Sequence, residues 1–515
     1  MKSALRAALL CAAFSHCAQA REVTFLTYNV ENLFDADKVA IFEDYAETGE
    51  SDAYSPEKTL RKMEGIAKVL KTFNDGAGPD IIAFNELELD FTPDTKVADY
   101  AGFLEKYKDT TAKKMLTSDL NDEIRGLPAE ALLLKHLADE GMTGYSIAIG
   151  ADEPDFAALA STERGIHKKG HKNGLFSKFP VKDIKSHATP DARDVLEVTL
   201  DVEGHPLVVF VNHWKSGASN LDSEQSRRFN AKTVRDRLDA IFAADPSADV
   251  IITGDFNSQY NQTAVYPFMG KTGINDVLGS QGDEAATAGA TNLSLYNLWH
   301  ELPEEKRGSD HYNGQWGTLM QGLVTPGLYD HNGLQYVDNS FTVVALDGAN
   351  SVTELGIPRR WSNLGQGSGF SDHFPVAFRI RTVADGDKAK RLELADAGKP
   401  SDETSLRPVG FDRLKADKLP VFDAKAAADL GARMGEFFRV AGKIASRRPL
   451  TLETGGNKYS LWASDKASDA LRPIRKLPVG SEVEIIGLLS THKGKPQFLV
   501  EDPAWILEYE AAEKD

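Results

Sequence analysis

Acidic, amide and histidine side chains stand next to the apolar runs of this sequence. Asp255 and Asn257 follow the run VIIT, and Glu86 follows DIIAF. The other members of the set stand next to TFLTY, LVVFV and FPVAF: Asn29, Glu31, Asn212, His213, Asp372 and His373. Carboxylate and amide oxygens suit Mg²⁺ or Mn²⁺, and histidines transfer protons near neutral pH. With amides that can donate to a phosphate oxygen, the set suits metal-assisted chemistry at a phosphate.

Each of these residues also has an ordinary explanation. In VIITGDFNSQ, the residues Gly254, Asp255 and Asn257 are common in turns after a buried strand, and a single histidine such as His213 is often structural. The set favours oxygen ligands over zinc, because the sequence has no HExxH pair and both cysteines lie in its first twenty residues.

The elements that would carry these residues alternate between strands and helices, which indicates an α/β fold. Strands are expected in REVTFLTYNV, PDIIAFNEL, GLFSK, VLEVTLDV, PLVVFVN and VIIT. Helices are expected in SPEKTLRKMEGIAKVLKTF, near Ala129 to Leu137, and from Asp222 to Ala244. The stretch 281–290 looks like a surface loop. Ligand sites of α/β proteins lie in loops at strand ends, which is where the polar set stands.

The first twenty residues predict export. They have a basic start, a short apolar run and a small-residue end at Ala18-Gln19-Ala20, so residues 1–20 are expected to be a signal peptide cleaved before Arg21. The mature chain would contain no cysteine and could enter an oxidising compartment without forming wrong disulfides. A periplasmic or extracellular location is expected, and no other segment is apolar enough to span a membrane. The sequence does not indicate an oligomeric state.

The length of 515 residues predicts two or three domains. A catalytic domain is expected at 21–380, a charged linker at 381–420, and a small β-barrel of short strands at 421–515. The formal charge of −18 argues against tight nonspecific binding to nucleic acid.

A basic island interrupts this acidic chain in the barrel region. From Ala441 to Val500 there are ten Lys or Arg against five Asp or Glu. Tyr459 and Trp462 lie among them, where they could stack on the bases of a single strand or belong to the core.

Seven motifs carry a resemblance to a known family. LTYNVENLFD, FNELE, NGLFSKFPV, VNHWKS, SEQSRR, GDFNS and GFSDHFPV, in this order and spacing, resemble those of the endonuclease/exonuclease/phosphatase superfamily, and within it predicted bacterial extracellular nucleases. The resemblance implies a four-layer α/β sandwich of two mixed β-sheets flanked by helices. It also implies hydrolysis of a phosphoester with a divalent cation, Mg²⁺ or Mn²⁺. The C-terminal part weakly resembles an oligonucleotide-binding (OB) β-barrel.

The resemblance implies a role for each residue of the set. Glu86 matches the principal metal ligand, with Asn29 and Glu31 beside it, and Asp372 completes the metal site. Asp255 matches the residue that orients or deprotonates the attacking water. The remaining members match groups that face the substrate: His213 and His373 on either side of the phosphate, Asn257 as a donor to it, and Asn212, Lys215 and Arg193 as further substrate contacts.

The chain departs from the superfamily pattern at two positions. Met320 stands where an Asp usually follows a Trp-x-x-Leu step and serves as the partner of the first histidine. Asp310 or Asp330 is expected to substitute, or turnover is weak. Asn85 stands where Gln commonly precedes the metal-binding Glu, which changes a side contact and not the ligand.

Three functions remain open on this sequence. The first is an exported, metal-dependent nuclease with a nucleic acid substrate, DNA before RNA. The second is a phosphatase or sphingomyelinase-like phosphodiesterase of the same superfamily. The third is a catalytically weakened nucleic-acid-binding protein, for which Met320 is the argument.

Overall fold

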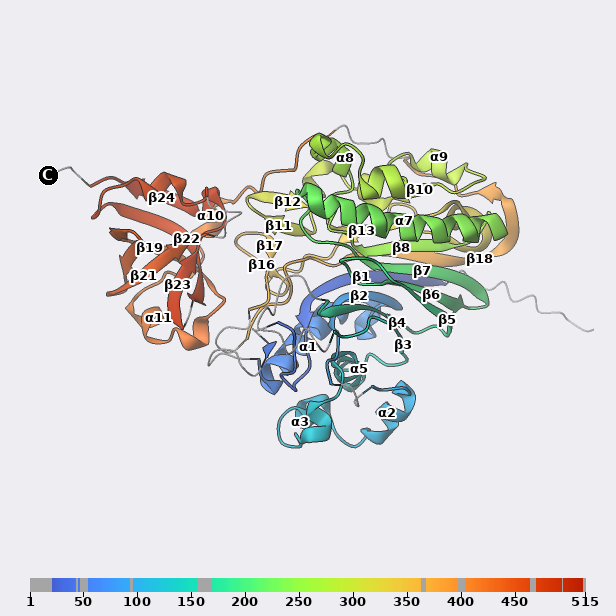
Figure 1. The fold of residues 1–515 in the computed structure, drawn as a ribbon, viewed down its shortest axis with the longest axis horizontal. Coiled ribbons are helices and arrows are strands. Elements are labelled where there is room, and N and C mark those ends of the chain that lie inside the picture. Colours follow the sequence, from blue (N-terminus) through green and yellow to red (C-terminus); the bar gives the residue numbers. More distant parts are fainter. Residues whose placement is uncertain are drawn as a thin grey trace, which may run out of the picture.

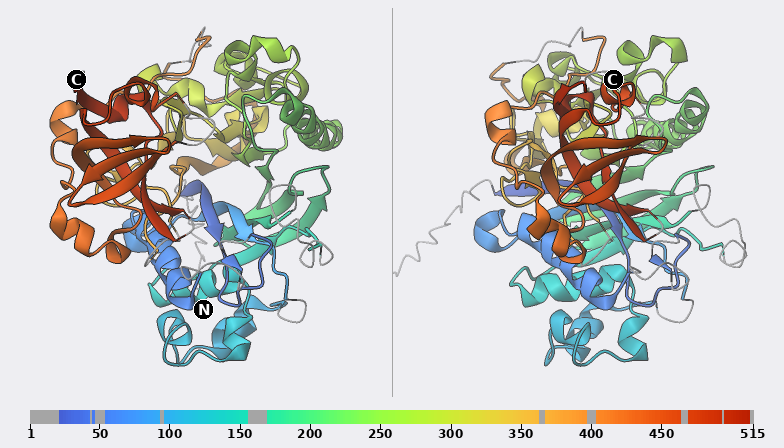
Figure 2. Two further views of the ribbon diagram at one scale, coloured as in Figure 1. Left: turned by 60° about the vertical axis from the view of Figure 1, so that its left-hand side comes forward. Right: turned by 90° about the vertical axis from the view of Figure 1, so that its left-hand side faces the viewer.

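The structure is a computed structural model that describes residues 21–42, 45–46, 54–92, 96–155, 169–362, 367–396, 403–463, 469–492 and 494–512. The predicted signal peptide, 1–20, lies outside the described residues. Two large sheets lie face to face beside a separate barrel that carries the C-terminus (Figures 1 and 2). Among the described residues, no helix has both the length and the apolar composition that a membrane span requires.

The first sheet is mixed, and its strands run in the order β14-β18-β1-β2-β4-β3, with β15 paired to β18. β1 and β2 are parallel, while the other neighbours are antiparallel. Its strands are β1 (Glu22–Leu33), β2 (Ile81–Glu88), β3 (Ser146–Ile149), β4 (His171–Ser177), β14 (Asp330–Tyr336), β15 (Thr342–Val343) and β18 (Val376–Arg391).

The second sheet is also mixed, in the order β5-β6-β7-β8-β13-β10-β9. The pair β7 and β8 is parallel and lies at its centre. Its strands are β5 (Val181–His187), β6 (Val195–Val202), β7 (His205–His213), β8 (Val250–Asp255), β9 (Ser280–Gln281), β10 (Leu295–Asn297) and β13 (Met320–Val324).

Helices cover the outer face of each sheet. α1 (Pro56–Leu70) begins at the N-cap Ser55, whose side chain accepts from Lys58 N, and its apolar stripe packs with α5 (Ala129–Asp139) on the first sheet. α7 (Leu221–Ala244) packs Val234 and Leu238 on the second sheet. The shorter helices of this part are α2 (Tyr100–Lys106), α3 (Ala112–Met115), α4 (Asp122–Arg125), α8 (Gln262–Val265) and α9 (Glu284–Ala288).

A third apolar core fills the space between the two sheets. It joins Phe25 and Phe378 of the first sheet, whose rings stack at 4.9 Å, to Val209 and Ile251 of the second. The architecture is therefore helices, sheet, sheet, helices. The predicted four-layer α/β sandwich of two mixed sheets is confirmed.

Two local predictions are wrong. The stretch 281–290 contains the end of β9 and the helix α9, and its Glu284 and Thr287 are fully buried, so polar residues that suggested a surface loop lie inside. The expected linker begins as a strand, because β18 continues to Arg391 with β14 as its partner. Residues 385–390 near the end of β18 are exposed, so this part of the strand shows no apolar periodicity.

The C-terminal part forms a closed barrel of five strands. Its ring is β19-β20-β21-β23-β22, closed by pairing of β19 with β22, and β24 adds to β22. This barrel fits the predicted OB-like element. Its elements are β19 (Phe437–Arg447), β20 (Leu450–Thr454), β21 (Asn457–Trp462), β22 (Glu482–His492), β23 (Lys495–Leu499), β24 (Ile506–Glu510) and the helices α10 (Arg413–Ala416), α11 (Ala424–Ala428) and α12 (Arg472–Arg475).

A hairpin of the sandwich holds the barrel. The hairpin consists of β11 (Asp310–Tyr312) and β12 (Gln315–Gly317), and Trp316 packs against the barrel core. A second small hairpin, β16 (Ser351–Val352) and β17 (Ile357–Pro358), contributes Val352 and Ile357 to the same core. His311 lies 3.3 Å from Asp502 of the barrel. The barrel therefore packs against the segments that follow β10 and precede β18.

Candidate active site

The site forms where the two parallel strand pairs end. In the first sheet Asn29 of β1 is in register with Asn85 of β2, and in the second His213 of β7 is in register with Asp255 of β8. The Oγ1 atoms of Thr27 and Thr253, two residues before these ends, lie 2.5 Å apart and join the sheets. The carboxyl ends of four strands therefore open into one place.

The backbone leaves the strand conformation at these ends. Glu86 and Asn257 have φ of 64° and 47°, and Glu31 has φ of 47°, which are rare values for residues with side chains. Gly254 has φ of 130°, and a Cβ there would lie 1.9 Å from Asn212 O, so only glycine fits beside β7. The turns direct the following side chains into the site.

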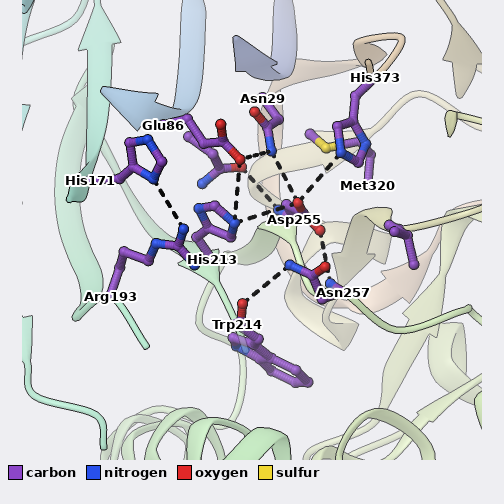
Figure 3. Close-up of polar contacts among 12 residues, drawn as sticks. Asn29, Glu86, His171, Arg193, His213, Trp214, Asp255, Asn257, Met320 and His373 are labelled. Carbon is purple, nitrogen blue, oxygen red and sulfur yellow. Dashed lines mark hydrogen bonds and ion pairs between the residues drawn. The ribbon is translucent and has the colours of Figure 1, made fainter. Parts of the chain in front are cut away.

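Asp255 lies at the centre of the site (Figure 3). Its Oδ2 accepts from Asn29 Nδ2 at 3.0 Å, and its Oδ1 accepts from Asn257 N at 2.8 Å. The same Asn29 amide donates to Glu86 Oε1 at 3.1 Å. His213 Nε2 lies 3.6 Å from Asp255 Oδ2 and 3.8 Å from Glu86 Oε1. Two carboxylates from different sheets thus share one amide and one imidazole.

The two histidines differ in charge. Burial, and after it the charges of Arg193 and His171, lower the pKa of His213 well below its ordinary value, so the imidazole is neutral. Burial also opposes charge on His373, but Asp372, Asp255 and further carboxylates raise its pKa to about 9. Its Nε2 lies 3.7 Å from Asp255 Oδ2 and 3.7 Å from Asp372 Oδ1. Environments that separate two pKa values in this way provide a base and an acid.

The ligand atoms fit a divalent cation. Glu86, His213 and Asp255 each offer an atom within 4.8 Å of the others. Burial, and the charge of Asp372, raise the pKa of Glu86, and burial raises the pKa of Asp255. Asp372 Oδ1 is buried and accepts no hydrogen bond. Hard carboxylate oxygens, one of which has no hydrogen-bond partner, suit Mg²⁺ or Mn²⁺.

Two of the predicted metal ligands have other partners, and their roles are revised. Glu31 binds Arg360 Nε at 2.6 Å and accepts from Trp361 N at 2.7 Å. Asn29 uses its Oδ1 to accept from Glu31 N and its Nδ2 to hold the two carboxylates. Glu86 and Asp372, with Asp255, remain as the residues that could hold a cation.

Of the three predicted substrate contacts, only Arg193 faces the site. Asn212 is fully buried, and its amide is used by Phe210 O, Thr253 O and the Trp214 indole, so its predicted contact with substrate is wrong. Lys215 is half-buried. Its backbone N donates to Asn230 Oδ1, and its carbonyl accepts from Arg227 Nη1. Arg193 faces the site, where its charge acts on Glu86 and His213.

Sequence reasoning missed His171. Its Nδ1 accepts from Arg193 Nη2 at 3.0 Å, and its Nε2 lies 2.6 Å from Asn32 Oδ1. Its ring is nearly parallel to that of His213 at 6.4 Å. The available signal was the polar start of β4, where His171 and Lys172 directly precede the NGLFSKFPV motif.

Asn85, the variant residue before Glu86, is fully buried and uses its side-chain amide in three hydrogen bonds. Its Nδ2 donates to Asn173 Oδ1 at 2.8 Å and to Asn212 O at 2.9 Å, and its Oδ1 accepts from Asp255 N at 2.9 Å. The amide therefore ties β2 to β4, β7 and β8. It supports the ligands without facing the substrate.

Met320 belongs to the His373 side of the site, not to the His213 side that the superfamily pattern suggested. Its backbone N donates to Ser309 Oγ at 3.3 Å, and the next residue, Asp310, is bridged to His373. Met320 is fully buried and in register with Asp255. Asp310 acts on the same histidine, since its charge helps to raise the pKa of His373 and its backbone is bridged to it. Asp330 lies elsewhere, 3.8 Å from Arg391 at the far end of β18. Of the two candidate acids, Asp310 is therefore the one next to a histidine of the site, although its carboxylate accepts from Ser309 Oγ and Leu319 N and not from His373.

The substitution Met320→Asp tests how well Asp310 substitutes. His373 Nδ1 is buried without a hydrogen-bond partner, so a carboxylate beside it should fix the imidazole and raise turnover of bis-p-nitrophenyl phosphate about tenfold, which is somewhat more than 1 kcal/mol of barrier. The metal requirement should stay unchanged. A lower melting temperature without faster turnover would mean that the new acid is only an unpaired buried charge.

Comparison with known proteins agrees with this geometry. A family model described as the Endonuclease/Exonuclease/phosphatase family matches residues 163–382, less than half of the chain. This range contains His213, Asp255 and His373. A search of the curated proteins found no match.

Solved structures show distant similarity. An endonuclease/exonuclease/phosphatase from Beutenbergia cavernae is 16% identical, with 71% of this chain and 72% of that chain covered and a TM-score of 0.41. A family protein from Leptotrichia buccalis is 14% identical over 70% and 99% of the two chains, with a TM-score of 0.39. TDP2 from D. rerio, complexed with single strand DNA product, is 13% identical over 70% and 98%, with a TM-score of 0.36. Residues 163–382 thus match the endonuclease/exonuclease/phosphatase family model, and the motifs around Asp255 and His373 in this range resemble those of the same superfamily.

Proposed function

We propose that the protein is a divalent-metal-dependent nuclease that hydrolyses phosphodiester bonds of DNA after export from the cytoplasm. The match to the family model supports a phosphodiesterase or nuclease type of activity. The observation that carries the proposal is the convergence of Glu86, Asp255 and His213 within 4.8 Å at strand ends of both sheets. Export, to the periplasm or the medium, rests on the predicted signal peptide alone.

The residues divide the work of hydrolysis. Glu86 and Asp372 would hold Mg²⁺ or Mn²⁺, whose charge offsets that of the phosphate. Asp255 accepts a proton from the attacking water, because its carboxylate is buried and already oriented by Asn29 and Asn257. Neutral His213 and cationic His373 lie on either side of Asp255, where an N–H of each ring would donate a hydrogen bond to a phosphate oxygen.

Asn257 keeps one donor for the substrate. Its Nδ2 donates to Trp214 O at 3.2 Å, and a primary amide has a second N–H. Its backbone N–H is used by Asp255. One N–H of the side chain therefore remains for a phosphate oxygen, as the predicted role requires.

The barrel has one acidic face and one face that could bind a polymeric substrate. Its β19, β22 and β24 strands line a groove of about 510 Å³ that carries four glutamates, Glu482, Glu484, Glu508 and Glu510, and this face repels nucleic acid. The opposite strands, β21 and β23, carry exposed Lys458 and Lys495. Trp462, which is 47% exposed, ends β21.

Only one of the two predicted stacking residues is available. Tyr459 is 2% exposed and packs against the rings of Phe422 and Phe498, so its predicted contact with nucleic acid is wrong. Trp462 lies on the outer face, paired with Leu499. Alternation along β21 placed one aromatic inside and the other outside.

The exposed Trp462 is connected to the site by a short path. Its carbonyl accepts from Val500 N, and the next residue, Glu501, helps to raise the pKa of both Arg360 and Tyr312. Arg360 lies 3.8 Å from Asp372, and Tyr312 is 47% exposed on the hairpin that holds the barrel. A strand of nucleic acid cleaved at Asp255 would extend past Tyr312 toward Trp462, where bases can stack.

Substrate and metal are tested together. The purified mature protein should cleave plasmid DNA, lose this activity in EDTA, and regain it with Mg²⁺ or Mn²⁺, because the available ligands are hard oxygens. RNA, inositol phosphates and sphingomyelin are assayed in parallel. Activity on sphingomyelin or inositol phosphates without activity on DNA would replace the nuclease by a phosphodiesterase of another substrate class, and binding of DNA without cleavage would indicate a weakened enzyme.

The role of the barrel is tested by Trp462→Ala. Loss of one stacked base should weaken binding of single-stranded DNA and so raise its KM about tenfold, since base stacking contributes about 1–3 kcal/mol. Turnover of bis-p-nitrophenyl phosphate should not change, because this small diester does not reach the barrel. Tyr509→Ala, an exposed aromatic on the acidic face, is the matched control. Equal loss in both variants, or in neither, would contradict a path along β21.

A further inference from the structure

A second acidic cluster lies at the open edge of the sandwich, away from the strand ends that form the site. It consists of Glu284 on α9, Glu301 at the end of the 3₁₀ turn Leu298–Glu301, and Asp338 just after β14. Each offers a carboxylate oxygen within 4.8 Å of the other two. β14 is the edge strand of the first sheet, and β9 and β10 form the corresponding edge of the second. The cluster therefore connects both sheets.

The cluster has fewer hydrogen bonds than its burial requires. Tyr336 OH and Phe341 N donate to Glu301 Oε2 at 2.7 and 3.3 Å, and Ala395 N donates to Asp338 Oδ2 at 2.7 Å. The second oxygens, Glu301 Oε1 and Asp338 Oδ1, are buried and accept no hydrogen bond. Buried polar atoms in native proteins are nearly always paired.

A buried tyrosine provides a second, independent sign of a ligand. Tyr296 is fully buried, and its hydroxyl has no hydrogen-bond partner. Burial and then the charges of all three carboxylates raise its pKa, which places the hydroxyl next to the cluster. Tyr296 lies on β10, directly before the turn that ends at Glu301, so a fourth side chain with an unpaired oxygen stands beside the cluster.

Two basic residues near Glu301, Arg307 and His300, form no ion pair with it. Arg307 uses Nη1 for Tyr260 OH at 2.7 Å and Nε for Leu302 O at 2.9 Å. Burial lowers the pKa of His300 to about 4, so that imidazole is neutral. In the described part of the chain, neither Glu301 nor Asp338 forms an ion pair with Lys or Arg. Burial, and the neighbouring acids, raise the pKa of Glu301 to about 8.

We propose that Glu284, Glu301 and Asp338 bind one Ca²⁺ ion, which clamps the edges of the two sheets together. Ca²⁺ takes oxygen ligands at about 2.3–2.6 Å, so two ligands of one ion lie at most about 5.2 Å apart. The three carboxylate oxygens of the cluster, all within 4.8 Å of one another, meet this limit. The two unpaired carboxylate oxygens and the Tyr296 hydroxyl supply ligand atoms in addition to those already hydrogen-bonded. Glu301 and Asp338 are half-buried, which leaves a route for the ion. The site is structural and independent of the proposed hydrolysis.

The alternative is a proton in place of the ion, with Glu301 held as a neutral acid, and the two are separated by melting experiments. The full mature chain is stripped with EDTA and melted with and without Ca²⁺, in a Glu86→Gln background that removes the first cation site. Ca²⁺ at about a hundred times its Kd should raise the melting temperature by about 5 °C. Adding Glu301→Gln and Asp338→Asn should abolish this rise, while Glu305→Gln, an exposed neighbour, should leave it intact.

A neutral acid predicts the opposite pattern. Gln and Asn imitate protonated carboxyls, so the variant would melt as the parent does and Ca²⁺ would have no effect on either, which would overturn the proposal. If the double variant does not fold, equilibrium dialysis of the Glu86→Gln protein decides: one bound Ca²⁺ per molecule is expected, and none would refute the site.

Discussion

The amide of Asn29 joins the two halves of this molecule. It donates to Glu86 at the end of β2 in the first sheet and to Asp255 at the end of β8 in the second. Both carboxylates are buried, and burial is the main cause that raises the pKa of each. The rare backbone conformations at Glu86 and Gly254 lie at the same strand ends and bring the two acids to one point.

Two buried carboxylates can both stay charged only if nearby positive charge offsets their repulsion. In the strand-end site the candidates are a divalent cation, the cationic His373 and the charge of Arg193, which suits a site built to receive a phosphate. Under the proposed function the barrel would add a surface for the rest of a polymer, because the β11–β12 hairpin that carries Tyr312 attaches it to the sandwich. In the proposed Ca²⁺ site at the sheet edges, a cation would likewise offset buried carboxylates, there for stability and not for catalysis.

The sequence was sufficient for features that are local. The apolar stripe of α1, the strands that deliver Asp255 and His213, and the α/β class could be predicted, because periodicity is encoded in short segments. The four-layer arrangement was implied only by the resemblance of the motifs to a known superfamily. Features that depend on packing were missed. The charged end of β18 is a strand only because β14 pairs with it, Glu31 is taken by Arg360 from a distant segment, and Met320 belongs to the His373 side of the site only once β13 lies beside β8.

The central claim is that Glu86 holds a cation while His213 acts on the phosphate without holding it. The most direct test measures Mn²⁺ bound per molecule and hydrolysis of DNA in the same two variants. His213→Ala should lose at least about a hundredfold in turnover and bind Mn²⁺ as the unaltered protein does. Glu86→Gln should lose turnover and bind one Mn²⁺ fewer. Full turnover in His213→Ala, or unchanged Mn²⁺ binding in Glu86→Gln, would contradict the account.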